Sequence, residues 1–303
     1  MRRFPVSVAV MALLVAPVGP ATAVDDPLQD AREAASQLVF TATVTVQWAD
    51  AAGTHTQTML VESDRGRVRI DYRPWTSGPT DLDLPPAGRK YDLRIGPGPL
   101  VAGRPTTMVE LWSAGVLRER LGVDQATGLV LLREQLGPEG LPVRVVTVQE
   151  LEVSTVPGSP SIGTTTTTVV ALPRAYRAPV RLAGDYLQLA AFRHGSIVQT
   201  VYSDGLRAIS VFAQPGTLDE GSLPRGGQVV RLGRRSGWSY AWPGGVAVTW
   251  ETGGVVYTMI GDGPGEELVA AAASLPAPPE PSLLDRLKRS SRNMAELLTG
   301  RRS

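Results

Sequence analysis

The 303-residue sequence contains no cysteine and only two histidines, His55 and His194. Without thiols it can form no disulfide, no thiolate nucleophile and no cysteine-based zinc or iron–sulfur site. Two isolated histidines next to turn residues provide neither a histidine-rich metal cluster nor a recognisable Ser-His-Asp arrangement. We therefore expect a protein that is not an enzyme, with no catalytic residue, no cofactor and no metal site.

Charge is also scarce, at 19% of residues, and nearly balanced, with a formal net charge of +1. Nucleic-acid-binding domains carry a basic patch on the fold itself, so this balance argues against such a partner. The exception is residues 282–303, where six basic residues face only two acidic ones. Leucines at helical spacing share this segment, which therefore predicts a basic amphipathic tail with potential for peripheral membrane contact.

The N-terminus has the order of a secretory signal. Arg2 and Arg3 precede an apolar run that ends in the small residues Ala21, Thr22 and Ala23. This order predicts a signal peptide over residues 1–23 and an extracytoplasmic location, in the periplasm or another part of the cell envelope. A retained, uncleaved anchor is the alternative.

Alternating apolar and polar residues dominate residues 24–154. The clearest example is 39–48, where apolar residues alternate with threonines and a glutamine. Successive segments of this kind, joined by short turns such as Gly96–Pro99, predict an antiparallel curved-sheet domain behind a short helix that begins near Leu28. Its inner face would either be filled as a core or left open as a groove for an apolar ligand, lined by Phe40, Val44, Trp48, Val68, Ile70 and Tyr72.

Residues 155–170 change to a Pro-, Gly-, Ser- and Thr-rich composition typical of a linker. Further alternating segments follow in 171–275, ending in a helix predicted over 265–274. The prolines of 276–281 predict a stiff spacer before the tail. The expected fold class is thus α+β and mostly antiparallel β, with a large half-barrel sheet domain followed by a smaller C-terminal sheet domain with one helix.

A motif in the second half resembles a known family. The run Tyr202-Ser203-Asp204-Gly205-Leu206, followed by Ser210-Val211-Phe212, resembles the signature of the MucB/RseB regulators of extracytoplasmic sigma factors. Shorter matches occur in the same order at 101–105, 123–129 and 172–173. Ser203-Asp204-Gly205 predicts a tight turn with Gly205 at positive φ. The motif would either specify this turn only or also contact a partner.

The resemblance implies an N-terminal domain similar to envelope lipoprotein carriers and a function without catalysis. Such proteins bind the outer segment of a membrane-spanning anti-sigma factor and shield it from proteolysis, and a lipidic ligand weakens their grip in the envelope stress response. On this basis Tyr202, Ser203, Asp204, Gly205 and Leu206 are candidate partner-binding residues. The alternative function is a lipid or lipoprotein carrier of the cell envelope.

Overall fold

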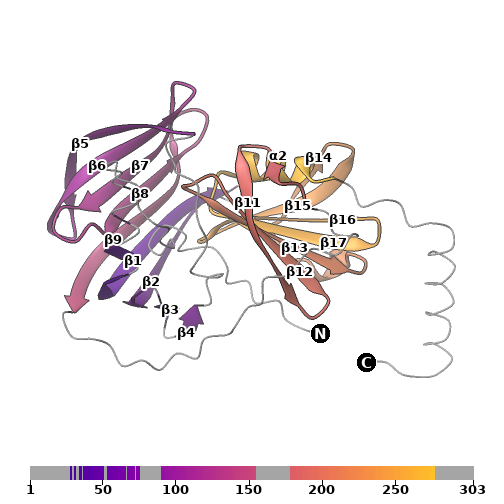
Figure 1. The fold of residues 1–303 in the computed structure, drawn as a ribbon, viewed down its shortest axis with the longest axis horizontal. Coiled ribbons are helices and arrows are strands. Elements are labelled where there is room, and N and C mark those ends of the chain that lie inside the picture. Colours follow the sequence, from indigo (N-terminus) through magenta and orange to yellow (C-terminus); the bar gives the residue numbers. More distant parts are fainter. Residues whose placement is uncertain are drawn as a thin grey trace, which may run out of the picture.

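A computed structural model describes residues 37–50, 53–65, 67–71, 73–75, 90–154 and 178–276, together with Leu28, Ala31, Ala34 and Ala35. These residues form two antiparallel sheets that lie next to each other (Figure 1). The predicted fold class, mostly antiparallel with a large curved sheet before a smaller sheet with one helix, is confirmed. The predicted signal peptide, linker and tail, and Tyr72, lie outside the described residues.

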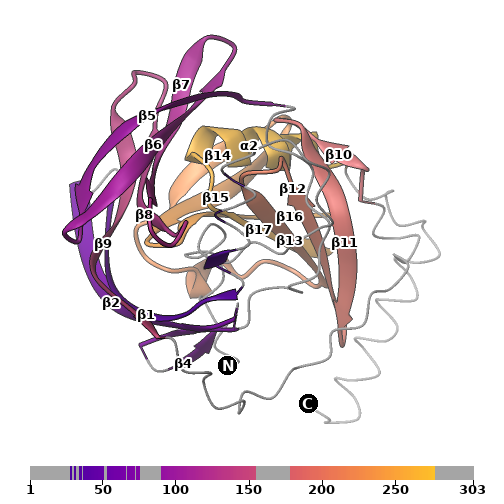
Figure 2. The same cartoon turned by 60° about the vertical axis from the view of Figure 1, so that its left-hand side comes forward.

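Sheet A is the N-terminal sheet, with nine strands in the order β4-β3-β2-β1-β9-β8-β7-β6-β5. Its strands are β1 Val39–Asp50, β2 Gly53–Asp64, β3 Arg67–Ile70, β4 Arg73–Trp75, β5 Asp92–Val101, β6 Arg104–Ser113, β7 Val116–Asp124, β8 Val130–Leu136 and β9 Pro142–Ser154. Figure 2 shows the sheet curled like part of a barrel. Register shifts in the β1–β9 pair and in the pairs from β5 to β9 supply bulges, which bend strands and increase their twist.

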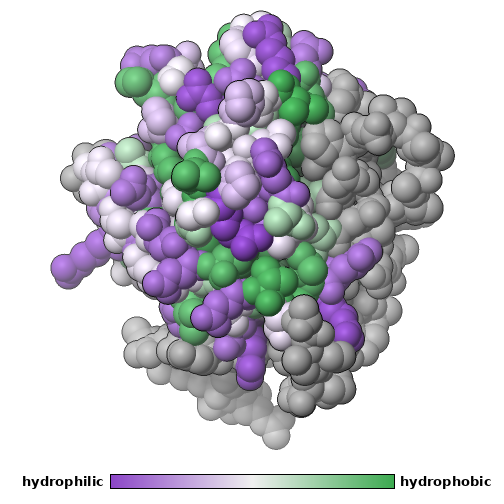
Figure 3. All heavy atoms as spheres, turned by 90° about the vertical axis from the view of Figure 1, so that its left-hand side faces the viewer, coloured by the Kyte–Doolittle hydropathy of each residue, from purple (hydrophilic) through white to green (hydrophobic). Residues whose placement is uncertain are grey.

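The concave face of sheet A carries its core. The predicted alternation in β1 is confirmed, since Phe40, Ala42, Val44 and Val46 are buried. Leu28, Ala31, Ala34 and Ala35 are helical, as their spacing predicts, and three of them are buried against the sheet. The opposite, outer face mixes polar and apolar residues (Figure 3).

Sheet B is the C-terminal sheet, with eight strands in the order β10-β11-β12-β13-β17-β16-β15-β14. Its elements are β10 Arg181–Leu182, β11 Tyr186–His194, β12 Ile197–Ser203, β13 Ala208–Pro215, the 3-10 helix η3 Glu220–Ser222, β14 Gln228–Leu232, β15 Arg235–Trp242, β16 Gly245–Thr252, β17 Val255–Gly261 and α2 Gly265–Ser274. Leu268, Ala271 and Ala272 of α2 pack on buried residues of this sheet, including Trp250 and Met259. Each sheet therefore has an apolar core of its own.

Two expectations from the sequence are wrong. Gly96–Pro99 is not a turn, because β5 continues through it with a register shift between Pro97 and Leu100. Such a run fits there because β5 is the edge strand of sheet A, where proline costs no ladder hydrogen bond. Five strands were also not expected from the sequence. Charged residues or glycine interrupt the apolar alternation of β7, β14 and β15, and β4 and β10 are only three and two residues long.

Candidate functional site: the junction between the sheets

The family-like motif forms the loop between β12 and β13. Asp204 Oδ1 accepts hydrogen bonds from the backbone N–H groups of Leu206 and Arg207, at 3.0 and 2.8 Å. Ser203 Oγ accepts one from Gly205 N at 3.0 Å and donates one to Arg207 O at 2.8 Å. Gly205 has φ +92°, as the sequence predicts for a left-handed turn position. The motif residues therefore build this loop from within.

The same loop reaches across to sheet A. Asp204 Oδ2, which the loop does not use, accepts from Lys90 Nζ and from the Tyr91 hydroxyl, each at 2.7 Å. Lys90 and Tyr91 directly precede β5. Leu206 is 5% exposed and belongs to the apolar cluster of sheet A that contains Tyr91 and Leu121. One loop of sheet B thus supplies both a charge and an apolar side chain to sheet A.

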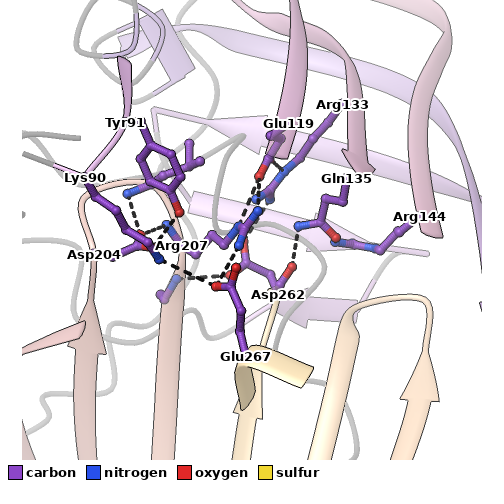
Figure 4. A network of polar contacts seen from close by, with 12 residues as sticks. Lys90, Tyr91, Glu119, Arg133, Gln135, Arg144, Asp204, Arg207, Asp262 and Glu267 are labelled. Carbon is purple, nitrogen blue, oxygen red and sulfur yellow. Dashed lines mark hydrogen bonds and ion pairs between the residues drawn. The ribbon is translucent and has the colours of Figure 1, made fainter. Parts of the chain in front are cut away.

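A chain of ion pairs continues along the junction (Figure 4). Lys90 Nζ lies 3.5 Å from Glu267 Oε2, which Arg207 Nη1 approaches to 2.9 Å. Arg207 then donates through Nε to Glu119 Oε2 at 3.1 Å. Glu119 also pairs with Arg133, whose Nη1 lies 2.8 Å from Asp262 Oδ2. We call these seven residues the ionic chain: Lys90, Asp204, Glu267, Arg207, Glu119, Arg133 and Asp262.

The side chains of the ionic chain are largely shielded from solvent. The side chains of Arg207 and Glu119 are 0% exposed, that of Asp262 is 1% exposed and that of Arg133 is 6% exposed. Lys90, at 13%, and Glu267, at 20%, lie at its more accessible end. Charges removed from water to this extent are costly unless they are paired, and here each pairs with at least one opposite charge.

The charges of the two sheets are complementary at the junction. Sheet A and the residues before β5 contribute three cations and one carboxylate, whereas sheet B and α2 contribute three carboxylates and one cation. The two sides therefore carry formal charges of +2 and −2. The groups on the first side are Lys90, Arg133, Arg144 and Glu119, and those on the second are Asp204, Asp262, Glu267 and Arg207. Such complementarity fixes how two surfaces dock and excludes other registers.

Pairing outweighs burial in setting the pKa values of two carboxyl groups. Burial alone would raise the pKa of Asp204, but the charges of Lys90 and Arg207 bring it below its ordinary value. The pKa of Glu267 is likewise lowered, because Arg207 and Lys90 outweigh its burial. Burial raises the pKa of the Tyr91 hydroxyl, so this group is a neutral donor to Asp204. Both carboxyl groups are thus charged at neutral pH.

Arg144 of β9 ends the network on a different footing. Its Nε donates to Pro243 O at 3.0 Å and its Nη1 to Gln135 Oε1 at 3.5 Å, while Nη2 has no hydrogen-bond partner among the residues that the structure describes. Burial, followed by repulsion from Arg133, lowers the pKa of Arg144 to about 10. Gln135 in turn donates to the backbone carbonyl of Asp262. Arg144 is therefore a buried cation that hydrogen bonds to neutral groups.

A cleft of about 280 Å³ opens beside this network and is walled by both sheets. Asp50 and Val143 line it from sheet A, and Gln228, Ala241 and Glu266 line it from sheet B and α2. Asp50 Oδ1 also contacts His55 Nε2 at 2.9 Å, and the His55 ring stacks on Trp48. A molecule held in this cleft would touch both sheets at once.

The structure places the candidate groove residues in the core of sheet A. Phe40, Val44 and Val68 are buried in one apolar cluster, and Trp48 and Ile70 pack against it partly buried. They are brought together as the alternation predicts, and a role in ligand binding stays a prediction. The candidate partner-binding residues 202–206 are all buried, Tyr202 in the apolar core of sheet B and Asp204 and Leu206 against sheet A, so in this arrangement of the sheets their side chains are not open to solvent.

Of the ionic chain, sequence reasoning singled out only Asp204 and missed the other six residues. Glu119, Arg133 and Asp262 were not singled out, because their role depends on a meeting of two sheets that no local pattern reveals. A weak signal was available: Glu119 and Arg133 occupy inward positions in β7 and β8, where alternation would place apolar residues. A charged residue at such a position requires a buried partner.

Two further searches concern other kinds of site. Among the described residues, no group of three or more histidine, aspartate or glutamate side chains is arranged to hold a metal ion. In that same part of the chain, none of the helices has the length and apolar character needed to cross a membrane.

Comparison with known proteins gave matches among solved structures only. No family model and no curated protein sequence matches the chain. The chain is similar to the MucA/MucB complex structure from Pseudomonas aeruginosa, at 20% identity and a TM-score of 0.47 over 84% of this chain and 98% of that one. It is also similar to a crystal structure of MucB, at 21% identity and a TM-score of 0.47 over 83% and 97% of the two chains.

A second structure of MucB, in complex with the MucA periplasmic segment, matches at 20% identity and a TM-score of 0.43, over 85% of this chain and 100% of that one. All three of these solved structures contain MucB.

Proposed function

We propose that this chain is a non-enzymatic extracytoplasmic regulator that binds the outer segment of a membrane-spanning anti-sigma factor. By holding that segment it shields it from proteolysis and so controls an envelope-stress sigma factor. A lipidic ligand on the concave face of sheet A would weaken the grip. The predicted signal peptide would deliver the chain to the compartment in which the outer segment lies.

The observation that carries this proposal is the place of the family-like motif. Residues 202–207 join two antiparallel sheets through buried contacts, including Asp204 to Lys90 and Arg207 to Glu119. A substitution in this loop would disturb both the loop and the contact between the sheets, because the two depend on the same side chains. The motif that resembles the signature of the regulators thus forms the contact between the two sheets, on which a regulator with two domains would depend.

The cleft beside the junction supports binding of a polypeptide. Its walls come from both sheets, and glycine, proline and alanine contribute much of its lining. Small side chains leave backbone groups accessible to an extended segment. A partner seated there would bind only while the two sheets keep their present arrangement, which links its affinity to the junction.

The test is capture from membranes with the exported chain as bait. We expect the chain to recover a single-span membrane protein whose cytoplasmic part binds a sigma factor, and to slow proteolysis of that protein's outer segment. The variant Ala241→Trp, which fills the cleft, should weaken capture about tenfold or more. Val229→Ala, at an exposed position of β14, is the matched control and should bind like the wild type.

Recovery of lipid without any membrane-anchored regulator would contradict the proposal and favour a lipid or lipoprotein carrier. Equal capture by Ala241→Trp and wild-type chains would remove the cleft from the binding surface. Thermal unfolding of each variant must be measured alongside, because a folding defect would also weaken capture.

A further inference from the structure

We propose that the junction is a reversible latch between two independently cored sheets, and that the 202–207 loop is its bolt. In the closed state, which the structure shows, the ionic chain is assembled. In the open state the sheets separate, and the same charged groups return to water. This inference concerns the chain alone and does not require the proposed partner.

The first argument is the distribution of apolar contacts. The largest apolar cluster of sheet B contains only residues from 178 onward, and one cluster of sheet A contains only residues before 154. Among the described residues, Leu206 is the single buried apolar side chain that joins a cluster of the other sheet. Apolar burial drives most protein association. Among the residues that the structure describes, little of it joins the two sheets.

The second argument is the energetics of buried ion pairs. Removing charges from water costs about as much as their mutual attraction returns, so a complete buried network adds little net affinity. Removing one member has a much larger effect, because its former partners are then left buried and unpaired. A contact made of such pairs is specific in register and readily reversed.

The third argument is geometric. Asp204 uses Oδ1 to shape its own loop and Oδ2 to reach Lys90 and Tyr91. Arg207, at the other end of the loop, lies between Glu119 of sheet A and Glu267 of α2. Because these residues belong to the loop itself, opening the junction withdraws them together without unravelling β12 or β13. Elements that are rigid and move as units are the usual parts of a conformational switch.

The absence of cysteine makes the latch easy to measure. Cysteines introduced at Glu152 of β9 and Arg231 of β14, both exposed, can be spin-labelled without competing thiols. Pulsed electron resonance then reports the distance between sheets. Wild-type chains should give one narrow distribution. Glu119→Gln, which strips Arg133 and Arg207 of a shared carboxylate, should raise the ratio of open to closed chains at least tenfold.

Two further variants keep the test decisive. Glu110→Gln is the matched control, because Glu110 pairs with Arg120 at 3.3 Å on the outer face and should leave the distribution unchanged. Lys90→Met removes the accessible end of the ionic chain and should also open the junction. It provides the test if Glu119→Gln does not fold. Circular dichroism of each variant establishes that both sheets are intact.

A Glu119→Gln chain with both sheets folded and a wild-type distance distribution overturns the latch. So does a Lys90→Met chain that behaves in the same way. Loss of sheet structure in both variants, in place of separation, is equally contrary, since it would make the ionic chain part of one indivisible core. Each of these results is independent of whether membrane capture succeeds.

Discussion

Two ion-pair networks are built from the same two strands of sheet A and lie on opposite faces. Neighbouring residues in β7, Glu119 and Arg120, point to opposite faces, as do Arg133 and Glu134 in β8. The inner pair, Glu119–Arg133, is 0% and 6% exposed, whereas the outer pair, Arg120–Glu134, is 39% and 25% exposed. The same two residue types thus pair twice, once out of water and once in contact with it.

Burial, and not the number of pairs, decides what an ion pair does. On the outer face water screens the charges, and either partner can be lost at a cost of about 0–1 kcal/mol. At the junction water cannot take the place of a lost partner, so the residues of the ionic chain act as a unit. The inner network therefore determines how the two sheets are arranged, whereas the outer pair lies on a solvent-exposed surface and has little effect on that arrangement.

The sharpest test of this comparison is to remove an arginine from each network. Arg207→Met removes the cation that Glu119 and Glu267 share, which leaves Glu119 paired with Arg133 alone and Glu267 with Lys90 alone. We expect the closed state to lose about 3–5 kcal/mol relative to the open state, measured by the ratio of open to closed chains in the spin-label experiment. Arg120→Met on the outer face should lose no more than about 1 kcal/mol. Equal losses for the two variants would show that burial does not distinguish the two networks.

The apolar part of the junction should have the next largest effect. Leu206 is 5% exposed and inserts into the cluster of sheet A around Tyr91, so Leu206→Ala should cost about 2–5 kcal/mol. Part of that cost should appear as separation of the sheets in the spin-label measurement. Leu141→Ala, at a 63% exposed position, is the control and should change neither stability nor the distance.

The contrast between faces also explains what sequence could predict. Phe40, Ala42, Val44 and Val46 alternate with threonines, and this period of two gives the strand, its buried face and the class of sheet. The loop chemistry of Ser203, Asp204 and Gly205 is equally local, because each contact within the loop spans four residues or fewer. Local patterns of these kinds are legible in one sequence.

The junction could not be predicted from the sequence, because its contacts join residues that are far apart along the chain. Arg133 and Asp262 are separated by 129 residues, and Lys90 and Asp204 by 114. No periodicity links such residues, and a charged side chain in a strand resembles a solvated one until its face is known. The resemblance marked residues 202–206 as special, but it could not say that they face the other sheet.

Acid provides a further, smaller effect. The pKa values of Asp204 and Glu267 are lowered in the closed state, while Lys90, Tyr91 and Arg207 surround them. Their pairing is therefore complete above the ordinary carboxyl pKa values of 3.8 and 4.5, and is lost as pH falls through the lowered ones.

We accordingly expect the closed fraction to be constant from about pH 8 to pH 5 and to fall below about pH 4. The spin-label distances of wild-type chains, recorded across this range, measure it. Opening between pH 5 and pH 7 would mean that a different group controls the latch.

The smallest effect is expected at Arg144, and it has the opposite sign from that at Arg207. Both guanidinium groups are buried, but that of Arg207 pairs with the carboxylates of Glu119 and Glu267, whereas the hydrogen bonds of Arg144 go to Pro243 O and the Gln135 amide. Its lowered pKa of about 10 reflects a charge that the closed state disfavours. Arg144→Met should therefore leave the free energy of unfolding unchanged or raise it by about 1 kcal/mol. A loss of the size expected for Arg207→Met would show that the charge of Arg144 stabilises the closed state. Pairing with carboxylates would then not explain why one buried arginine at this junction stabilises the protein and another does not.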